Sequence, residues 1–260
     1  MRELRNILSD FDSELELVPL IELADEPIYG VSTDGARAAT LWDVFHDQVD
    51  VTDHWPIIVG TDRDVEGHRQ AAGLRTTHLE RLDAGAAAIL ERLNSMPLED
   101  ALDQSRSVPP QDASRRIDVA TPADWHDELP DAGELALEAP LDLATGSAHD
   151  EVYLALCHTP SSWRCPLLLN FGGWNDCPPA EAHAAQLAQW QKTWGAELIS
   201  LTDTTMELRV ARRPDSWKQA FDVASEQADY CPELVSRGSW NLRTLAEYLC
   251  EKKLWRFWWS

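Results

Sequence analysis

The sequence lacks the features of a membrane or secreted protein. No apolar run among its 260 residues reaches the roughly 18–20 residues that span a bilayer. The N-terminal stretch is acidic from Ser9 to Glu16, whereas a secretory signal begins with a basic segment followed by an apolar one. We therefore expect a soluble, cytoplasmic protein.

Basic residues are scarce in the first part of the chain, and lysine is absent from residues 1–150. This part holds 32 acidic residues against 11 arginines, a net charge of −21, whereas residues 151–260 hold 13 acids against 11 bases, a net charge of −2. A negative field repels phosphate groups, so we expect neither nucleic acid nor a membrane as a partner. Two interpretations stay open. The charge steers a basic protein partner, or it serves solubility and adaptation to high internal salt.

The chain also lacks paired cysteine motifs. Its five cysteines all lie in the C-terminal half, their number is odd, and no CxxC motif occurs. Without a secretory signal, this pattern predicts reduced thiols and no disulfide framework. The five are Cys157, Cys165, Cys177, Cys231 and Cys250.

No metal or cofactor motif is present. The cysteines and histidines between positions 157 and 183 match no usual zinc spacing. Two of them, adjacent on a predicted strand, would point to opposite faces. We therefore expect neither a metal nor a cofactor. The residues in question are Cys157, His158, Cys165, Cys177 and His183.

Residues 1–104 contain the signals of a small acidic α/β region. Asp34 precedes a run with apolar residues at helical spacing, which predicts a helix with Asp34 as its N-cap. Residues 55–60 form a short apolar run between turn formers, which predicts a buried strand. A second helix is predicted over 77–94. The apolar residues of the first helix are Ala38, Leu41, Trp42, Phe45 and Val49.

The periodic pattern fades between residues 105 and 150. This stretch contains five prolines, and its ten acids face only three arginines. Such a composition buries too little apolar surface to offset the entropy of ordering. We expect an acidic linker with a short helix over 123–129, and place the boundary between an N-terminal region (1–104) and a C-terminal domain (151–260) in it.

Residues 151–260 are more strongly patterned and predict an α+β domain. The order of elements matches the split βαββαβ pattern of a ferredoxin-like sheet, with helices on one face. Two of the strands are separated by a two-residue turn, which is typical of a tight hairpin. The predicted strands are 151–157, 166–171, 196–202, 205–211 and 255–259, and the predicted helices are 180–194, 214–230 and 242–252.

Five motifs follow one another in this C-terminal part. They are the run LLNFGGWNDCPP at 168–179, His183, the hairpin at 196–210, the run EQADYCPE at 226–233 and the closing WRFWW at 255–259. Together they resemble the bacterial domain of unknown function 4253 family, over about residues 150–260. The resemblance implies a shared domain and carries over no activity. Ser260 departs from the pattern, where an acid is expected.

Cys177 is the strongest candidate for a reactive residue. It lies just before a predicted helix, where unpaired amide groups and the helix dipole lower the pKa of a thiol. His183 lies six residues further on, about 600° around a helix, so the spacing predicts no Cys–His pair. We favour a cysteine that fills a tight turn over a nucleophile or a redox sensor.

The carboxylates offer no evident acid–base constellation. The candidates are Asp203, Glu207, Glu226 and Glu233. Asp203 and Glu207 could share one strand face, but Asp203 falls in the predicted turn, where aspartate is common. Gly172 and Gly173 lack the frame and the lysine of a phosphate loop. They predict instead a backbone conformation closed to other residues.

Tryptophan is abundant, and nine of the twelve tryptophans lie in residues 151–260. Alternation along the last strand places Trp255, Phe257 and Trp259 on one face and Arg256 and Trp258 on the other. We favour an aromatic core between the two domains as the explanation.

The alternative is a groove for a ligand or partner, because tryptophan and tyrosine dominate binding hot spots. Trp174, Tyr230 and Trp258 would line it. The complete candidate surface is Gly172, Gly173, Trp174, Asn175, Cys177, His183, Asp203, Glu207, Tyr230 and Trp258.

These features favour a binding or regulatory module over an enzyme. The acidity suggests a protein that neutralises a basic partner in the manner of an immunity protein. The alternative is a small hydrolase or a thiol-dependent enzyme that uses Cys177. A purely structural module is the third interpretation.

Overall fold

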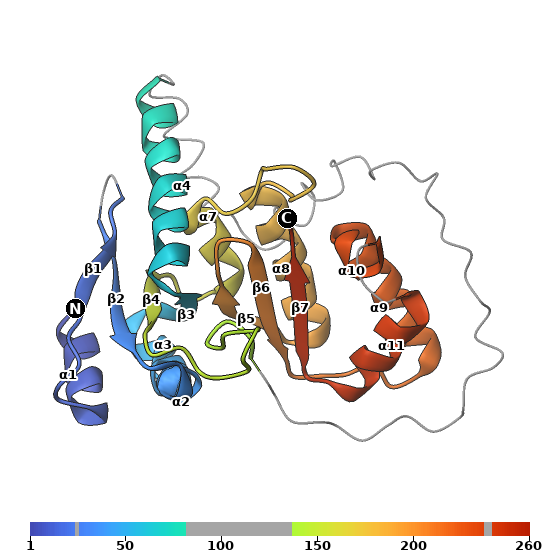
Figure 1. Cartoon of the computed structure of the whole chain (residues 1–260), viewed down its shortest axis with the longest axis horizontal. Coiled ribbons are helices and arrows are strands. Elements are labelled where there is room, and N and C mark those ends of the chain that lie inside the picture. Colours follow the sequence, from blue (N-terminus) through green and yellow to red (C-terminus); the bar gives the residue numbers. More distant parts are fainter. Residues whose placement is uncertain (24–25, 82–136, 237–240) are drawn as a thin grey trace.

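The computed structural model describes residues 1–23, 26–81, 137–236 and 241–260 (Figure 1). The predicted helix over 123–129, most of the predicted linker and the end of the predicted helix over 77–94 lie outside these residues. Within the described part of the chain, no helix has the length and apolar composition needed to cross a membrane.

A seven-stranded mixed sheet forms the centre of the molecule, in the order β1-β2-β4-β3-β5-β6-β7. Neighbouring strands are antiparallel except β3 and β5, which run parallel. The strands are β1 (Val18–Ile21), β2 (Ile28–Thr33), β3 (His54–Gly60), β4 (Val152–His158), β5 (Ala196–Leu201), β6 (Thr205–Val210) and β7 (Leu254–Trp258).

The predicted α+β class is confirmed, but the ferredoxin-like arrangement is not. A strand from the N-terminal region, β3, lies between β4 and β5 and pairs with both. The sheet therefore contains strands from both sides of the predicted linker. The division into 1–104, 105–150 and 151–260 stays a prediction.

The helices of the N-terminal region follow local signals. Helix α2 begins where the Asp34 carboxylate accepts a hydrogen bond from the Arg37 N–H at 3.0 Å. Its apolar face is buried, as predicted, and the Trp42 indole N–H donates to the carbonyl oxygen of Pro56 in β3 at 2.8 Å. The helices are α1 (Arg2–Phe11), α2 (Gly35–His46), α3 (Val49–Thr52) and α4 (Asp62–Arg81).

All three predicted C-terminal helices are found, as α8, α9 and α11, and the structure adds the short helices α7 and α10. The predicted strand over 166–171 is wrong because Cys165–Leu169 form the short helix α7. Pro166 stands in its first turn, and Asn170 ends it in the left-handed conformation. An unbroken apolar run does not distinguish a strand from a buried helix. The helices are α7, α8 (Ala180–Trp194), α9 (Trp217–Tyr230), α10 (Glu233–Ser236) and α11 (Leu242–Glu251), with a 3₁₀ turn at Ser162–Arg164.

The two faces of the sheet differ at β6 and β7. Trp255 and Phe257 are buried under α8 and α9, where Phe257 stacks on Trp190 at 5.2 Å and contacts Tyr230. On the other face, the Glu207 carboxylate accepts hydrogen bonds from the backbone of residues 138–139. The predicted alternation along the last strand is confirmed.

The aromatic core differs from the prediction in its location. The rings around Trp190 all belong to residues 151–260, so this core lies inside the C-terminal part and not between two domains. A second, smaller cluster of Trp42, His46 and Trp55 lies in the N-terminal region. The Arg209 guanidinium of β6 lies 4.4 Å from the Trp42 ring and joins the two regions.

Candidate functional site

A loop of left-handed residues leads from α7 to α8 and shapes the candidate site. Gly172, Gly173 and Asn175 have φ values of +100°, +86° and +46°. A Cβ atom at Gly172 would lie 2.0 Å from the Pro178 carbonyl oxygen, so glycine is required there by both conformation and space. The loop therefore turns back on itself and carries Cys177 over the first turn of α8.

Cys177 and His183 are in contact. Cys177 Sγ lies 3.4 Å from His183 Nε2, and both side chains are buried, with exposures of 4% and 0%. The prediction of no Cys–His pair is wrong because it treated both residues as helical. Helix α8 begins only at Ala180, so Cys177 belongs to the preceding loop, which brings its sulfur atom to His183 Nε2.

Tyr230, at the end of α9, completes a chain of three side chains. Its hydroxyl hydrogen-bonds to His183 Nδ1, and the same hydroxyl lies 3.9 Å from Met206 Sδ, to which it donates. In the tautomer that carries its proton on Nδ1, the Tyr230 oxygen accepts this hydrogen bond and the Nε2 lone pair faces the Cys177 thiol. A base role for His183 requires this tautomer.

Burial holds this chain in its neutral form. Burial raises the pKa of Cys177 to about 12 and lowers the pKa of His183 to about 3. Two weaker effects oppose it: the Gly173 N–H lowers the pKa of the thiol, and the Pro178 carbonyl raises the pKa of the imidazole. Because the main cause of both shifts is the loss of water, hydration of the site would bring the two pKa values together.

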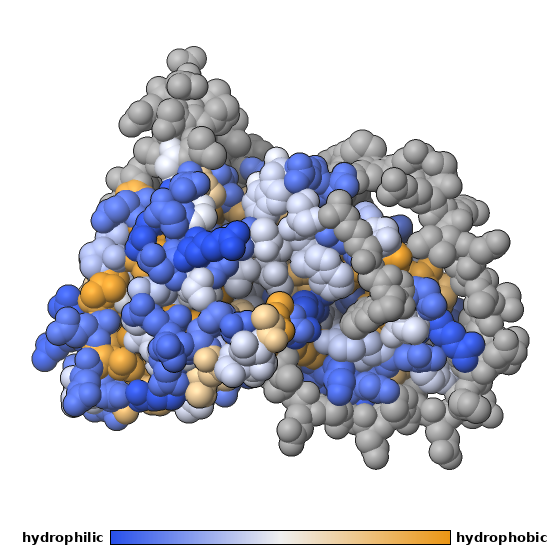
Figure 2. Space-filling view, in the orientation of Figure 1, coloured by the Kyte–Doolittle hydropathy of each residue, from blue (hydrophilic) through white to orange (hydrophobic). Residues whose placement is uncertain are grey.

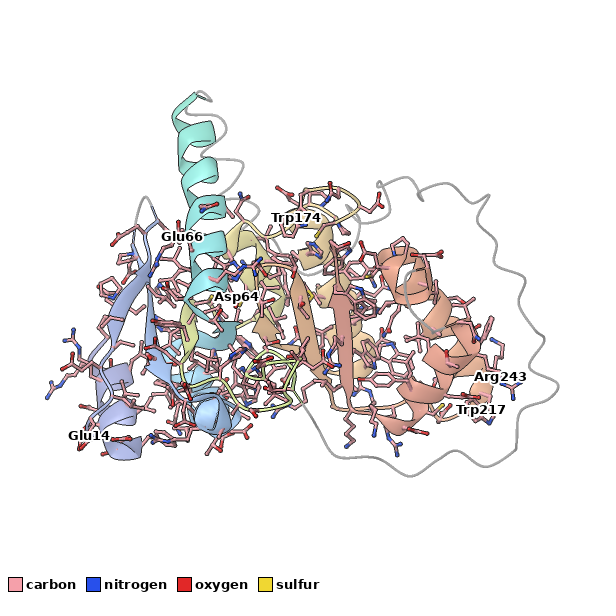
Figure 3. The ribbon with its side chains drawn as sticks, viewed as in Figure 1. Glu14, Asp64, Glu66, Trp174, Trp217 and Arg243 are labelled. Atoms are coloured by element: carbon pink, nitrogen blue, oxygen red, sulfur yellow. The ribbon has the colours of Figure 1, made fainter. Side chains whose placement is uncertain are left out.

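Aromatic rings surround the imidazole. The Phe171 and Trp259 rings each lie 5.1 Å from the His183 ring, centroid to centroid. Trp174 packs edge-on against Phe171 at 5.0 Å and is half-buried at the outer side of the loop (Figure 3). The site therefore has an apolar wall and one aromatic residue at the surface.

The end of the chain is tied to this loop. Asn175 donates to the Ser260 carbonyl oxygen at 3.0 Å, and the backbone N–H of Ser260 donates to Glu233 at 3.1 Å. The sequence pointed to Glu233 only as one of four carboxylates and placed neither Glu233 nor Trp259 beside Cys177. The signal was present, because both belong to motifs by which the C-terminal part resembles a family.

Asp203 lies apart from the Cys177 site. It stands after β5, at the edge where the parallel strands β3 and β5 end, and its carboxyl hydrogen-bonds to that of Asp64. Asp64 lies in the first turn of α4 (Figure 3). Burial raises the pKa of Asp203, and a hydrogen bond shared with the Asp64 carboxyl raises it further. The Asp64 carboxylate also accepts from the Thr61 N–H at 2.8 Å, so this pair serves the start of α4.

Glu207 and Trp258 lie on the opposite face of the sheet from Tyr230. Glu207 pairs with Arg256 across β6 and β7, whereas the neighbouring Met206 contacts Tyr230. The structure therefore does not bring Trp258 together with Trp174 and Tyr230 in one groove, as that alternative required.

The cysteines and histidines between positions 157 and 183 match no usual metal-binding spacing in the sequence. Within residues 1–23, 26–81, 137–236 and 241–260, no group of three or more histidine, cysteine or acidic side chains is placed to hold an ion. Cys157 is buried in β4, whereas the adjacent His158 is exposed and stacks on His54 at 4.7 Å. All five cysteines are free and buried.

Residues 153–260 match the family model described as Domain of unknown function (DUF4253). The match confirms the resemblance and covers the C-terminal part of the chain, including every residue of the Cys177 site. No curated protein and no solved structure is significantly similar to the chain.

Proposed function

Since the matched family has no assigned activity, we propose from the geometry alone that residues 153–260 carry a thiol-dependent enzyme site. Cys177 is the nucleophile, His183 is the general base and Tyr230 orients the base. The observation that supports this role is the continuous chain from Cys177 Sγ through both ring nitrogens of His183 to the Tyr230 hydroxyl. A nucleophile in contact with a base that a third group orients is the usual arrangement of covalent catalysis.

The neutral resting state fits a site that works only when substrate enters. A thiol with a pKa of about 12 has almost no thiolate near neutral pH, so Cys177 reacts only when His183 takes its proton. For substrate and water to reach Cys177, the loop that contains Gly172 and Gly173 must open, and glycine permits a wide range of backbone conformations. Proton transfer to His183 then activates the thiol, and the Pro178 carbonyl oxygen stabilises the imidazolium that forms.

Iodoacetamide alkylation of the folded protein tests this proposal. If the fraction of thiolate alone set the rates, Cys177 would react more slowly than Cys231 and Cys250. Burial raises the pKa of Cys177 to about 12, but the pKa of the other two only to about 11. We expect the opposite order, with Cys177 alkylated first, because His183 removes its proton. His183→Gln is expected to slow the reaction of Cys177 by about 100-fold or more. Peptide mass spectrometry measures each rate.

Denaturant provides the control, since all five thiols then react at similar rates. The proposal is wrong if Cys177 reacts last in the folded protein and His183→Gln leaves its rate unchanged. A turn-filling cysteine, the interpretation favoured by the sequence, gives that result.

Binding of a basic protein is a second candidate function. The observation that favours it is a row of exposed aspartates, Asp47, Asp50 and Asp53, along the end of α2 and α3. In the view of Figure 2, hydrophilic residues cover most of the surface over the N-terminal elements. Such a surface accelerates encounters with a positively charged partner. Neutralisation of a toxin-like partner belongs to this proposal.

Association kinetics test the second candidate. A basic protein captured from native lysate, then purified, is expected to bind more slowly when the three aspartates are changed to asparagine. The difference should be clear at low salt and vanish near physiological salt, where the Debye length is about 8 Å. Trp258→Ala, on a half-buried residue of β7, is expected to change mainly the dissociation rate. Binding that is indifferent to salt and to the three aspartates would exclude this role.

A further inference from the structure

Buried hydrogen-bond donors without acceptors gather near β7. Among the described residues, Trp255 Nε1, Trp259 Nε1 and Gln227 Nε2 are buried and have no hydrogen-bond partner. A buried donor without an acceptor costs about 1–3 kcal/mol, so native structures rarely contain one without a reason. A missing acceptor of this kind points to a water molecule or to a ligand.

Trp259 is the member of this group that belongs to the Cys177 site. Its ring lies 5.1 Å from the His183 ring and 5.6 Å from the Tyr230 ring, and its side chain is 1% exposed. Its backbone N–H donates to the Thr204 carbonyl oxygen at 3.0 Å, which fixes the strand end that carries the ring. The indole N–H is therefore an unused, buried donor on a ring that packs against the proposed base.

We propose that the Cys177 site acts on acyl compounds and that Trp259 Nε1 donates a hydrogen bond to the carbonyl oxygen of the substrate. This inference rests on the proposed function. Among the described residues, no lysine or arginine hydrogen-bonds to Cys177, His183, Tyr230 or Trp259. The site therefore offers a neutral donor and no charge for a phosphate group. A preorganised neutral donor in a dry site is how acyl-transfer enzymes stabilise an oxyanion.

The reaction would proceed by acylation of the thiol. The bond between Cys177 Sγ and the carbonyl carbon forms as the thiol proton passes to His183 Nε2 and the carbonyl π-electron pair moves to oxygen. That oxygen accepts the hydrogen bond from Trp259. When the carbonyl reforms, the leaving group departs with its bonding pair and takes the proton from His183. Water then attacks the thioester by the same steps and releases a carboxylic acid and the free thiol.

Acylation of the whole chain by p-nitrophenyl acetate tests the inference, with p-nitrophenolate release and acetyl-Cys177 as the readouts. Trp259→Phe is expected to slow acylation by about 100-fold or more, the usual effect of removing one oxyanion donor. The rate of Cys177 alkylation by iodoacetamide is expected to stay within about twofold of the rate in the unchanged protein, because alkylation creates no oxyanion. Trp255→Phe is the matched control. It also removes an unpaired buried N–H from the same strand face, but its ring contacts Trp190 and Trp194.

The outcomes separate this inference from the proposed function. The donor role is wrong if the Trp259→Phe protein is acylated as fast as the unchanged protein. It is also wrong if the substitution slows alkylation and acylation by the same factor. If Trp259→Phe does not fold, benzothienylalanine at position 259 keeps the ring shape without the N–H and gives the same comparison. If His183→Gln does not affect alkylation, the proposed function itself is wrong.

Discussion

Replacing Glu207 with glutamine is expected to lower the free energy of unfolding by about 3–5 kcal/mol, the usual effect of breaking a buried ion pair through one partner. The side chain is fully buried, and its carboxylate accepts every hydrogen bond that it makes. A glutamine amide would turn two donors toward groups that are themselves donors. The donors around Glu207 are Ser200 Oγ, the backbone N–H groups of Glu138 and Ala139, and Arg256 Nε and Nη2.

Urea denaturation measures this loss, and Glu197→Gln is the matched control. Glu197 lies on the neighbouring strand β5, and its carboxylate is 3.1 Å from Arg209 Nη2. Both partners are partly exposed, so the control is expected to cost less than about 1 kcal/mol. Equal losses in the two variants would show that Glu207 is not the anchor between the sheet and residues 138–139.

Replacing Gly172 with alanine is expected to destabilise the protein by about 2–5 kcal/mol. A left-handed φ costs an alanine about 1–2 kcal/mol, and overpacking costs about 1–3 kcal/mol more. The new methyl group would lie 2.0 Å from the Pro178 carbonyl oxygen and 2.7 Å from His183 Nε2. The imidazole must shift, so we also expect the preferential alkylation of Cys177 to disappear.

Gly173→Ala separates strain from crowding. Gly173 also has a positive φ, of +86°, but a Cβ atom there would meet nothing within 4 Å. We expect a loss of only about 1–2 kcal/mol, with Cys177 still alkylated first. Thermal unfolding and the alkylation rates measure both effects. A Gly172→Ala protein as stable as Gly173→Ala would mean that the loop does not press on His183.

Local signals in the sequence predicted α2, β3 and most elements of the C-terminal part, but not α1, β1 or β2, and they placed the start of α4 at residue 77 instead of Asp62. Asp34 predicted the start of α2, and the predicted end of a helix at residue 194 is confirmed, because Gly195 follows it with a φ of +62°. The turn at residues 203–204 predicted the hairpin of β5 and β6. Each of these signals acts through groups only a few residues apart, so a single sequence contains all the information needed.

The site could be predicted only in part, because its geometry depends on contacts distant in sequence. The spacing argument treated Cys177 and His183 as residues of one helix. In the structure, their distance is set by the loop that reverses the chain at Gly172. Tyr230 comes from another helix, which only the tertiary fold brings to His183. For the same reason, no local pattern could show that β3 pairs with β5.

The position of β3 has a consequence for how the molecule assembles. The family match begins at residue 153, in the interior of a sheet whose middle strand, β3, comes from residues 54–60. The first three strands are synthesised long before β4 and β5, the two partners on either side of β3. Pairings between such distant segments form slowly. We therefore expect the seven strands to fold as one cooperative unit. The family match begins inside this unit, at residue 153 in β4, and does not mark the start of an independently folding domain.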